Sequence, residues 1–253
     1  MTQHAFHASS NASARLAAIG MDTRLLSPPF DPLAIKALHA KKGEHILDVG
    51  CGEGHASFLI QAMGADCTGV DTDPSALAKA RAKGVKTVLQ TAETLFFEEE
   101  FDAAFTYGAL HWYRRPNIVA DSVWHALKRG GRFVGSLPAD GDMASLLDPL
   151  LAHFSAISGA DARYLLPWYL PSPEDWRARL EAAGFSVARC DLKTFSRPAK
   201  AEEVSGLLKM LVLPFSDVAP AGDLDDQAEA VRAKLPETVS LQYASVEFEA
   251  VRP

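Results

Sequence analysis

The feature that most constrains this chain is a short apolar segment that runs into a glycine-rich turn. Residues 45–49 are typical of a buried strand, and glycines follow at positions 50, 52 and 54. Residues 56–63 then show helical spacing of apolar side chains and end at Gly64. Because glycine has no Cβ, such a strand–turn–helix unit lets a ligand approach the backbone closely at a helix N-terminus. The pattern predicts a binding site, or alternatively a tight turn that needs only positive φ angles.

Strand and helix patterns continue to alternate after this unit. Further strands are predicted at 67–71, 86–90, 101–107 and 132–137, with helices at 74–83 and 118–127 between them. This alternation predicts an α/β fold with a doubly wound, mostly parallel sheet and right-handed crossovers. In such sheets the ligand lies beyond the carboxyl ends of the strands, where the strand order reverses. We therefore look for the site first at the glycine turn.

A carboxylate ends the second predicted strand. Asp71 lies 19 residues after Gly52, a position from which a carboxylate can accept hydrogen bonds from both hydroxyls of a ribose. Asp73 and Pro74 already supply the N-cap and first position of the next helix, so capping does not explain Asp71. A dinucleotide fingerprint would need a third glycine where this chain has His55, whose bulk would crowd a pyrophosphate. A nicotinamide cofactor is therefore disfavoured.

Residues 47–54 and 71–73 resemble motif one and the following acidic position of class I S-adenosylmethionine-dependent methyltransferases. Residues 90–93, 101–107 and 127–133 also match positions of that family, so the resemblance covers most of the chain. Within the family, residues 108–112 and 169–185 are similar to the trans-aconitate methyltransferase group. The resemblance implies a Rossmann-like seven-stranded sheet whose last strand is antiparallel, and S-adenosyl-L-methionine as the cofactor.

The resemblance also implies which residues bind the cofactor. The set is Asp48, Gly50, Cys51, Gly52, Asp71, Thr72, Thr91, Ala92, Glu93, Thr106, Tyr107 and His111. Asp71 is expected to bind the ribose diol, and Asp48 to orient the methionine end. Thr91 stands where many relatives have Asp beside the adenine, and Tyr107 where the aconitate group often has Asn. Tyr107 either lines the site or packs at the end of a buried strand.

The sequence contains no linker, repeat or low-complexity segment, so residues 1–253 are predicted to form a single domain. A cofactor-binding core is expected at about 40–138, and helical cap segments at about 142–170 and 193–238 are candidates to cover the site. Cap helices are predicted at 144–157, 201–212 and 224–234, and a capping box begins another helix at Ser172. The sixth and seventh strands are predicted at 185–192 and 240–251.

Methyl transfer from a sulfonium is an in-line displacement, so it requires alignment and exclusion of water rather than an obligatory catalytic residue. We therefore assign no catalytic residue. The favoured acceptor is a small-molecule carboxylate, methylated to an ester. Alternatives are a phenol, an amine or a carbon of a larger small molecule, or a non-catalytic cofactor-binding protein of the same fold. A protonated acceptor would promote His111 from pocket wall to general base.

The acceptor pocket is expected among aromatic side chains and arginines. The substrate-pocket residues are His111, Trp112, Tyr164, Trp168 and Tyr169, of which the last three form either a lid or a surface loop pinned by its rings. A carboxylate acceptor would pair with a guanidinium, and the candidates are Arg114, Arg115, Arg163 and Arg197.

Composition argues against several other functions. The formal net charge is −7, from 25 Lys and Arg against 32 Asp and Glu, so nucleic acid is not expected as a partner. The best apolar run, residues 207–215, is too short to span a bilayer, so no membrane partner is expected. The three cysteines suit a reducing cytoplasm, and no metal-binding motif is present. We expect a cytoplasmic protein with a small-molecule substrate and no metal.

Overall fold

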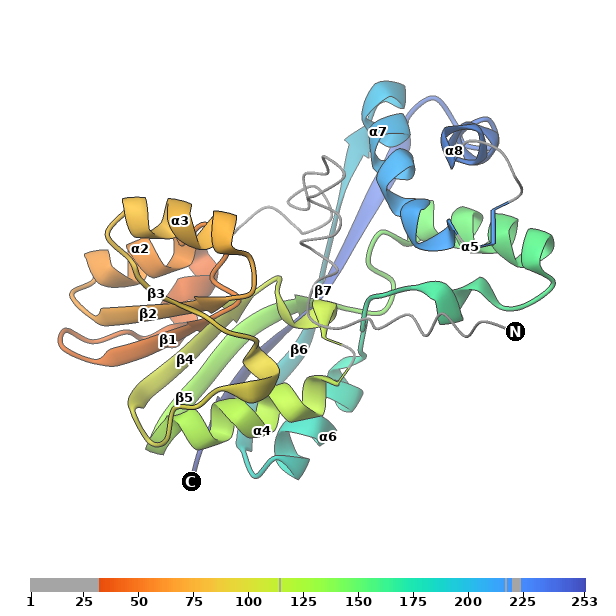
Figure 1. The fold of residues 1–253 in the computed structure, drawn as a ribbon. Helices are drawn as coiled ribbons and strands as arrows, with labels where there is room; N and C mark the ends of the chain where they lie inside the picture. The colour runs from red at the N-terminus through yellow and green to blue at the C-terminus, as the bar shows by residue number, and fades with distance from the viewer. Residues whose placement is uncertain (1–31, 114, 217, 220–223) are drawn as a thin grey trace, which may run out of the picture.

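The computed structural model describes residues 32–113, 115–216, 218–219 and 224–253. These residues form a seven-stranded sheet with the strand order β3-β2-β1-β4-β5-β7-β6 (Figure 1). The strands are β1 (His45–Val49), β2 (Asp66–Asp71), β3 (Lys86–Leu89), β4 (Phe101–Tyr107), β5 (Leu127–Pro138), β6 (Ser186–Ala199) and β7 (Val239–Val251).

The sheet has the predicted topology. Strands β1 to β5 pair in parallel, whereas β7 is antiparallel to both β5 and β6. The order reverses between β1 and β4, so the glycine turn that follows β1 lies at the switch point. The predicted Rossmann-like, doubly wound sheet with an antiparallel last strand is therefore confirmed.

Helices cover both faces of the parallel strands and form a cap. The α-helices are α2 (His55–Ala62), α3 (Pro74–Ala82), α4 (Pro116–Ala126), α5 (Ala144–Ser158), α6 (Pro173–Ala182), α7 (Ala201–Leu211) and α8 (Leu224–Arg232). The 3-10 helices are η2 (Pro32–Leu38), η3 (Ala92–Thr94), η4 (Leu110–Trp112), η5 (Ala162–Leu165) and η6 (Leu213–Phe215). Figure 1 shows α2 and α3 on one face of the sheet and α4 and α6 on the other, with α5, α7 and α8 grouped apart from them. No helix in the described part of the chain is both long and apolar enough to cross a membrane.

Alternation along the strands divides the core between the two faces of the sheet. On β1, Ile46 packs with α2 and η2, whereas Leu47 and Val49 belong to the cluster that includes α4 and α6. A third cluster joins α5, α7 and α8 to the outer ends of β6 and β7, including Leu241 and Tyr243. The cap therefore has a hydrophobic core of its own.

The predicted helix starts are confirmed at two places. The Asp73 side chain accepts a hydrogen bond of 2.8 Å from the Ser75 N–H at the start of α3. The Ser172 hydroxyl accepts one of 3.2 Å from the Asp175 N–H at the start of α6. In both helices a proline follows the cap, where the missing N–H costs nothing.

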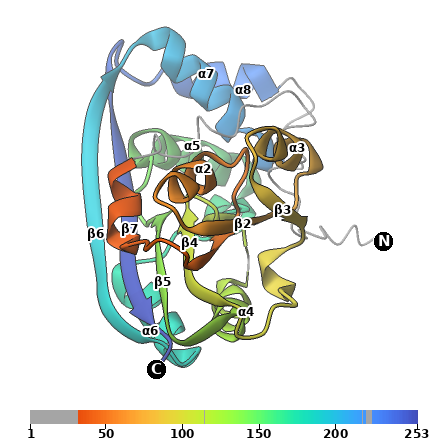
Figure 2. The ribbon, with the colours of Figure 1, turned by 90° about the vertical axis from the view of Figure 1, so that its left-hand side faces the viewer.

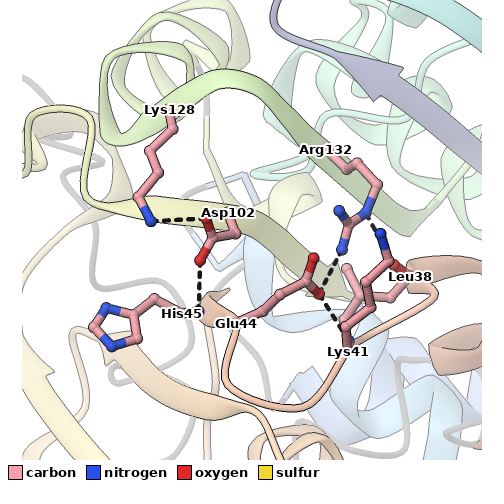
Figure 3. A network of polar contacts seen from close by, with 7 residues as sticks. All are labelled: Leu38, Lys41, Glu44, His45, Asp102, Lys128 and Arg132. Carbon is pink, nitrogen blue, oxygen red and sulfur yellow. Dashed lines mark hydrogen bonds and ion pairs between the residues drawn. The ribbon is translucent and has the colours of Figure 1, made fainter.

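Charged side chains join the amino ends of β1, β4 and β5 (Figure 3). Because the glycine turn follows the carboxyl end of β1, this network lies at the opposite end of the sheet. Asp102 accepts hydrogen bonds from the His45 N–H at 2.8 Å and the Lys128 ammonium at 2.7 Å. Arg132 donates to Glu44 at 2.8 Å. Burial alone would raise the pKa of Glu44, but the hydrogen bond from Arg132 and its charge are among the contacts that lower it overall. This network stabilises the sheet away from the site.

The sixth strand differs from the prediction. β6 does not end near residue 192 but continues to Ala199, so the segment 193–199 predicted as cap is strand, paired with β7 along its length. Figure 2 shows the two strands as a long ribbon that reaches α7. Most side chains of this half of β6 are exposed, and so the segment lacks the apolar alternation that would reveal a strand.

Candidate cofactor and acceptor site

The turn after β1 is built for close approach of the backbone. Gly50, Gly52 and Gly54 have φ angles of 72°, 51° and 76°, which other residues rarely adopt. A Cβ on Gly50 would lie 2.3 Å from the Ala109 Cβ, and one on Gly54 would lie 2.8 Å from the Ala80 Cβ. A Cβ on Gly52 would meet nothing within 4 Å. Gly50 and Gly54 thus allow tight packing, while Gly52 leaves open space for a ligand.

Asp71 holds this turn and remains able to bind a ligand. Its Oδ2 accepts a hydrogen bond of 2.8 Å from the Gly52 N–H, and its Oδ1 accepts one of 2.9 Å from the Asp73 N–H. The residue is only partly buried. Because a carboxylate oxygen has two lone pairs, each oxygen keeps one for a hydroxyl such as those of a ribose. The geometry of the turn therefore fits the nucleoside part of the implied cofactor.

Asp48 lies buried on β1 just before the turn. Its Oδ2 accepts a hydrogen bond of 2.5 Å from the Ser57 hydroxyl of α2. Burial is the main reason that the pKa of Asp48 is raised to about 6; the nearby charge of Asp71 contributes to this rise, and the hydrogen bond from Ser57 opposes it. A positively charged ligand group beside it would favour the ionised form.

Other residues predicted to bind the cofactor differ in their burial and in their hydrogen bonds. Thr91 caps η3 by accepting a bond of 3.3 Å from the Glu93 N–H, and Ala92 is buried, so the latter offers only its backbone. Thr106 is fully buried, and its hydroxyl donates to the Val49 carbonyl at 2.9 Å, which ties β4 to β1. The Thr106 side chain therefore has a structural role.

Three further residues of the predicted cofactor-binding set are buried or half-buried near the turn. Cys51 is a buried thiol whose pKa is raised by burial, so it stays protonated. Tyr107 is half-buried and packs against the cluster of α2 and η2. Thr72 follows β2 and is half-buried beside Asp71.

A small cavity lies at the carboxyl end of β5, under the cap. Its volume is about 20 Å³, and its lining residues are His111, Pro138, Asp142, Met143, Leu147, Trp168, Leu170 and Leu211. This space fits one functional group about the size of a hydroxyl. His111 belongs to η4, which begins at Leu110. The residue before it, Ala109, packs on Gly50 of the glycine turn. The η4 segment and its N-cap residue Ala109 thus connect the cavity wall with the glycine turn.

Polar groups in this cavity are buried and short of partners. His111 is 3% exposed, and its Nδ1 has no hydrogen-bond partner among the described residues. Burial lowers the pKa of His111 to about 3, so the imidazole is neutral and binds protons poorly. The Trp168 Nε1 is also buried without a partner within the described part of the chain.

Asp142 is a site residue that the sequence analysis did not identify. It is 5% exposed, and its Oδ1 accepts a hydrogen bond of 2.9 Å from the Ala244 N–H on β7. Burial raises the pKa of Asp142 to about 7, although the bond from Ala244 opposes the shift. In the sequence, Asp140-Gly141-Asp142 looks like an ordinary polar turn, so no local signal marks it.

The predicted pocket residues do not all gather at the cavity. His111 and Trp168 line it, and Trp112 packs between them with ring centroids 4.6 Å and 6.2 Å away. Tyr164 is 86% exposed and is not among the residues that line the cavity. Tyr169 donates instead to Asp175 at 2.6 Å.

Three of the four arginines proposed for an acidic acceptor do not line the cavity. Arg115 forms an ion pair of 3.4 Å with Glu93, and Arg163 is exposed. Arg197 on β6 pairs with Glu203 and donates to the Tyr243 hydroxyl at 3.2 Å. Arg114 lies outside the described residues. No cation from the described part of the chain lines the cavity.

Comparison with known proteins agrees with the fold and the turn. The family model for a methyltransferase domain matches residues 47–135. The chain is 28% identical to an uncharacterized methyltransferase of Schizosaccharomyces pombe, over 65% of this chain and 66% of that protein. It is 31% identical to the tRNA U34 carboxymethyltransferase of Pseudomonas aeruginosa, over 59% of this chain and 47% of that protein. The chain thus spans about half to just under two thirds of these relatives.

Solved structures give the same fold. A methyltransferase structure from Bacillus halodurans C-125 matches with a TM-score of 0.61 and 20% identity, covering 87% of this chain and 97% of that one. Phosphoethanolamine N-methyltransferase 2 of Haemonchus contortus, solved with S-adenosylhomocysteine, matches with a TM-score of 0.56 and 17% identity over 91% of this chain and 56% of that one. Residues 47–135 thus match a methyltransferase domain, and the chain has the fold of methyltransferase structures. Both findings agree with the predicted cofactor, S-adenosyl-L-methionine.

The expectation about partners is wrong. Net acidity led us to exclude nucleic acid, yet one relative is named for tRNA. One similar structure, from Haloferax volcanii, is a complex with the Trm112 methyltransferase activator, with a TM-score of 0.57 and 17% identity over 96% of each chain. Net charge averages over the whole surface, whereas binding depends on the local patch, so a charge of −7 excludes neither kind of partner. The described residues contain no cluster of side chains that could hold a metal ion.

Proposed function

We propose that this chain transfers the methyl group of S-adenosyl-L-methionine to an acceptor group presented to the cavity beside His111. One observation carries the proposal: Ala109, packed on Gly50, stands directly before η4, and η4 supplies His111 to the cavity wall. This connection supports an acceptor site next to the cofactor site. Methyl transfer needs this adjacency, because the acceptor atom must approach the methyl carbon to about 3–3.5 Å.

The residues around the two sites have separable roles in this proposal. Asp71 binds the ribose diol and Gly52 leaves space for it, while the Asp48 carboxylate balances the positive charge of the methionine end. When bound, the cofactor supplies an electrophilic methyl group on a positively charged sulfur. The neutral imidazole of His111 and the indole of Trp168 wall the cavity and exclude water.

Two experiments test this function. Calorimetric titration with S-adenosylhomocysteine and with NAD measures which cofactor binds, and tight NAD binding without any response to S-adenosylhomocysteine would overturn the proposal. Methyl-labelled cofactor is then supplied with a panel of small acids, alcohols, phenols and amines. Binding without transfer to any acceptor would favour a non-catalytic cofactor-binding protein.

The predicted carboxylate acceptor, including one like trans-aconitate, stays within that panel. An ester product is cleaved by mild base, so base lability of the labelled product identifies it. A tRNA acceptor is the second candidate, because a relative at 31% identity is named for tRNA. Total tRNA is therefore assayed beside the small acceptors, and label retained on tRNA after washing at high salt would favour this candidate.

A further inference from the structure

We propose that Asp142 determines the class of acceptor by accepting a hydrogen bond from a hydroxyl or amine in the cavity and by excluding carboxylates. This inference rests on the proposed function, because it assigns a ligand to the same cavity. It departs from the carboxylate that the sequence resemblance favours.

Three observations place a negative charge in the cavity wall. Asp142 lines the cavity and is almost completely buried. It accepts a hydrogen bond of 2.9 Å from the Ala244 N–H, and a further backbone hydrogen bond comes from Met143, so both contacts are with neutral backbone groups. No lysine, arginine or protonated histidine in the described residues forms an ion pair with it. Burying a carboxylate without a cationic partner is unfavourable, so proteins seldom keep such a group without a use for it.

Backbone strain at the next residue supports a functional reason for this arrangement. Met143, which also lines the cavity, has a φ of 54°, a left-handed conformation that is unusual for a side chain of this size. The Met143 N–H donates to the Gln242 carbonyl of β7 at 2.8 Å, and the Ala139 N–H donates to the Ala244 carbonyl at 3.0 Å. Contacts with β7 thus hold the loop in a strained shape that keeps Asp142 at the cavity. Strain of this kind is concentrated at functional sites.

The other polar groups complement a hydroxyl or an amine. Trp168 can only donate a hydrogen bond, and its Nε1 has no partner within the described part of the chain. A hydroxyl can donate to Asp142 and accept from such an indole, and an amine can donate to Asp142. A carboxylate would face the Asp142 charge with no cation of the described residues to offset it. His111 is neutral and supplies no positive charge.

The test uses three probes of matched shape: benzyl alcohol, benzylamine and benzoate. Their dissociation constants are measured at pH 8 by ligand-observed NMR, on the full chain with saturating S-adenosylhomocysteine. We expect benzyl alcohol or benzylamine to bind at least 10-fold more tightly than benzoate. In Asp142→Asn, which keeps the size and the Oδ1 acceptor, this preference should shrink at least 10-fold.

Asp140→Asn is the matched control. Asp140 lies two residues away on the same loop but is exposed, so its variant should keep the wild-type preference. Benzoate binding more tightly than both other probes would overturn the inference, as would an unchanged preference in folded Asp142→Asn. Binding of none of the three at millimolar concentration would overturn it as well. Failure of the proposed function is distinct, because it appears as absent S-adenosylhomocysteine binding, and the three probes can still be titrated without it.

Discussion

Replacing Asp142 by Asn should stabilise the protein at alkaline pH, since the native carboxylate is buried without a cation. Burial raises the pKa of Asp142 from 3.8, the value in the unfolded chain, to about 7 in the folded protein. Protonation of the folded carboxyl group therefore contributes its full stabilisation below pH 3.8, and this contribution is lost as the pH rises through about 7. A shift of about three pKa units at 1.36 kcal/mol each sets an upper limit of about 4 kcal/mol. The Asn amide must itself be accommodated, which leaves about 2 kcal/mol as the expected gain at pH 8.

Urea unfolding of the wild type and of Asp142→Asn at pH 8 and pH 5 checks this. A gain of about 2 kcal/mol corresponds to a rise of about 4–8 °C in Tm for a chain of this length. The gain should fall by more than half at pH 5, where the native carboxyl is protonated. Asp140→Asn should change stability at neither pH, because Asp140 is exposed. If Asp142→Asn were destabilised equally at both pH values, the side chain would act only through its bond to Ala244, and the argument from buried charge would be refuted.

Three other substitutions test the glycine turn and the charged network at the amino ends of β1, β4 and β5. Asp71→Ala should weaken S-adenosylhomocysteine binding by about 1.5–3 kcal/mol, measured by calorimetry, because hydrogen bonds to a charged group are lost; an unchanged dissociation constant in a folded variant would reassign the residue. Gly50→Ala should lower stability by at least about 1 kcal/mol in thermal unfolding and abolish cofactor binding, because the new Cβ would lie 2.3 Å from that of Ala109 at a φ of 72°. Glu44→Gln should cost about 1–2 kcal/mol at pH 7 through the loss of charge opposite Arg132; because the native pKa of Glu44 is lowered, this cost should shrink as the pH falls below the unfolded value of 4.5 and vanish only below the native pKa.

The parallel sheet could be predicted because its signals are local. Residues 45–49 carry their own apolar run, Asp73 caps its own helix, and the glycines of the turn stand next to both. The position of Asp71 against Gly52 could also be predicted, since strand and turn lengths determine it. Periodicity and capping within about twenty residues were sufficient for all of these.

The acceptor site could not be predicted, since its residues meet only through tertiary contacts. Asp142 is buried by the cap and held by Ala244, which lies 102 positions away along the chain. Tyr164 looked like a lid residue because it is aromatic, yet its ring is exposed to solvent. The outer half of β6 escaped detection because its stability comes from pairing with β7 rather than from burial of alternate side chains.

The ribbon of β6 and β7 has a consequence for how this molecule unfolds. Phe248 on β7 belongs to the hydrophobic cluster of the sheet, and Tyr243 on the same strand belongs to the cluster of the cap. Both clusters therefore share one hydrogen-bonded pair of strands, and neither can lose its order without freeing part of the other. Amide hydrogens in α5 and in the centre of β5 should exchange with solvent at nearly the same free energy of opening, as in a single cooperative unit.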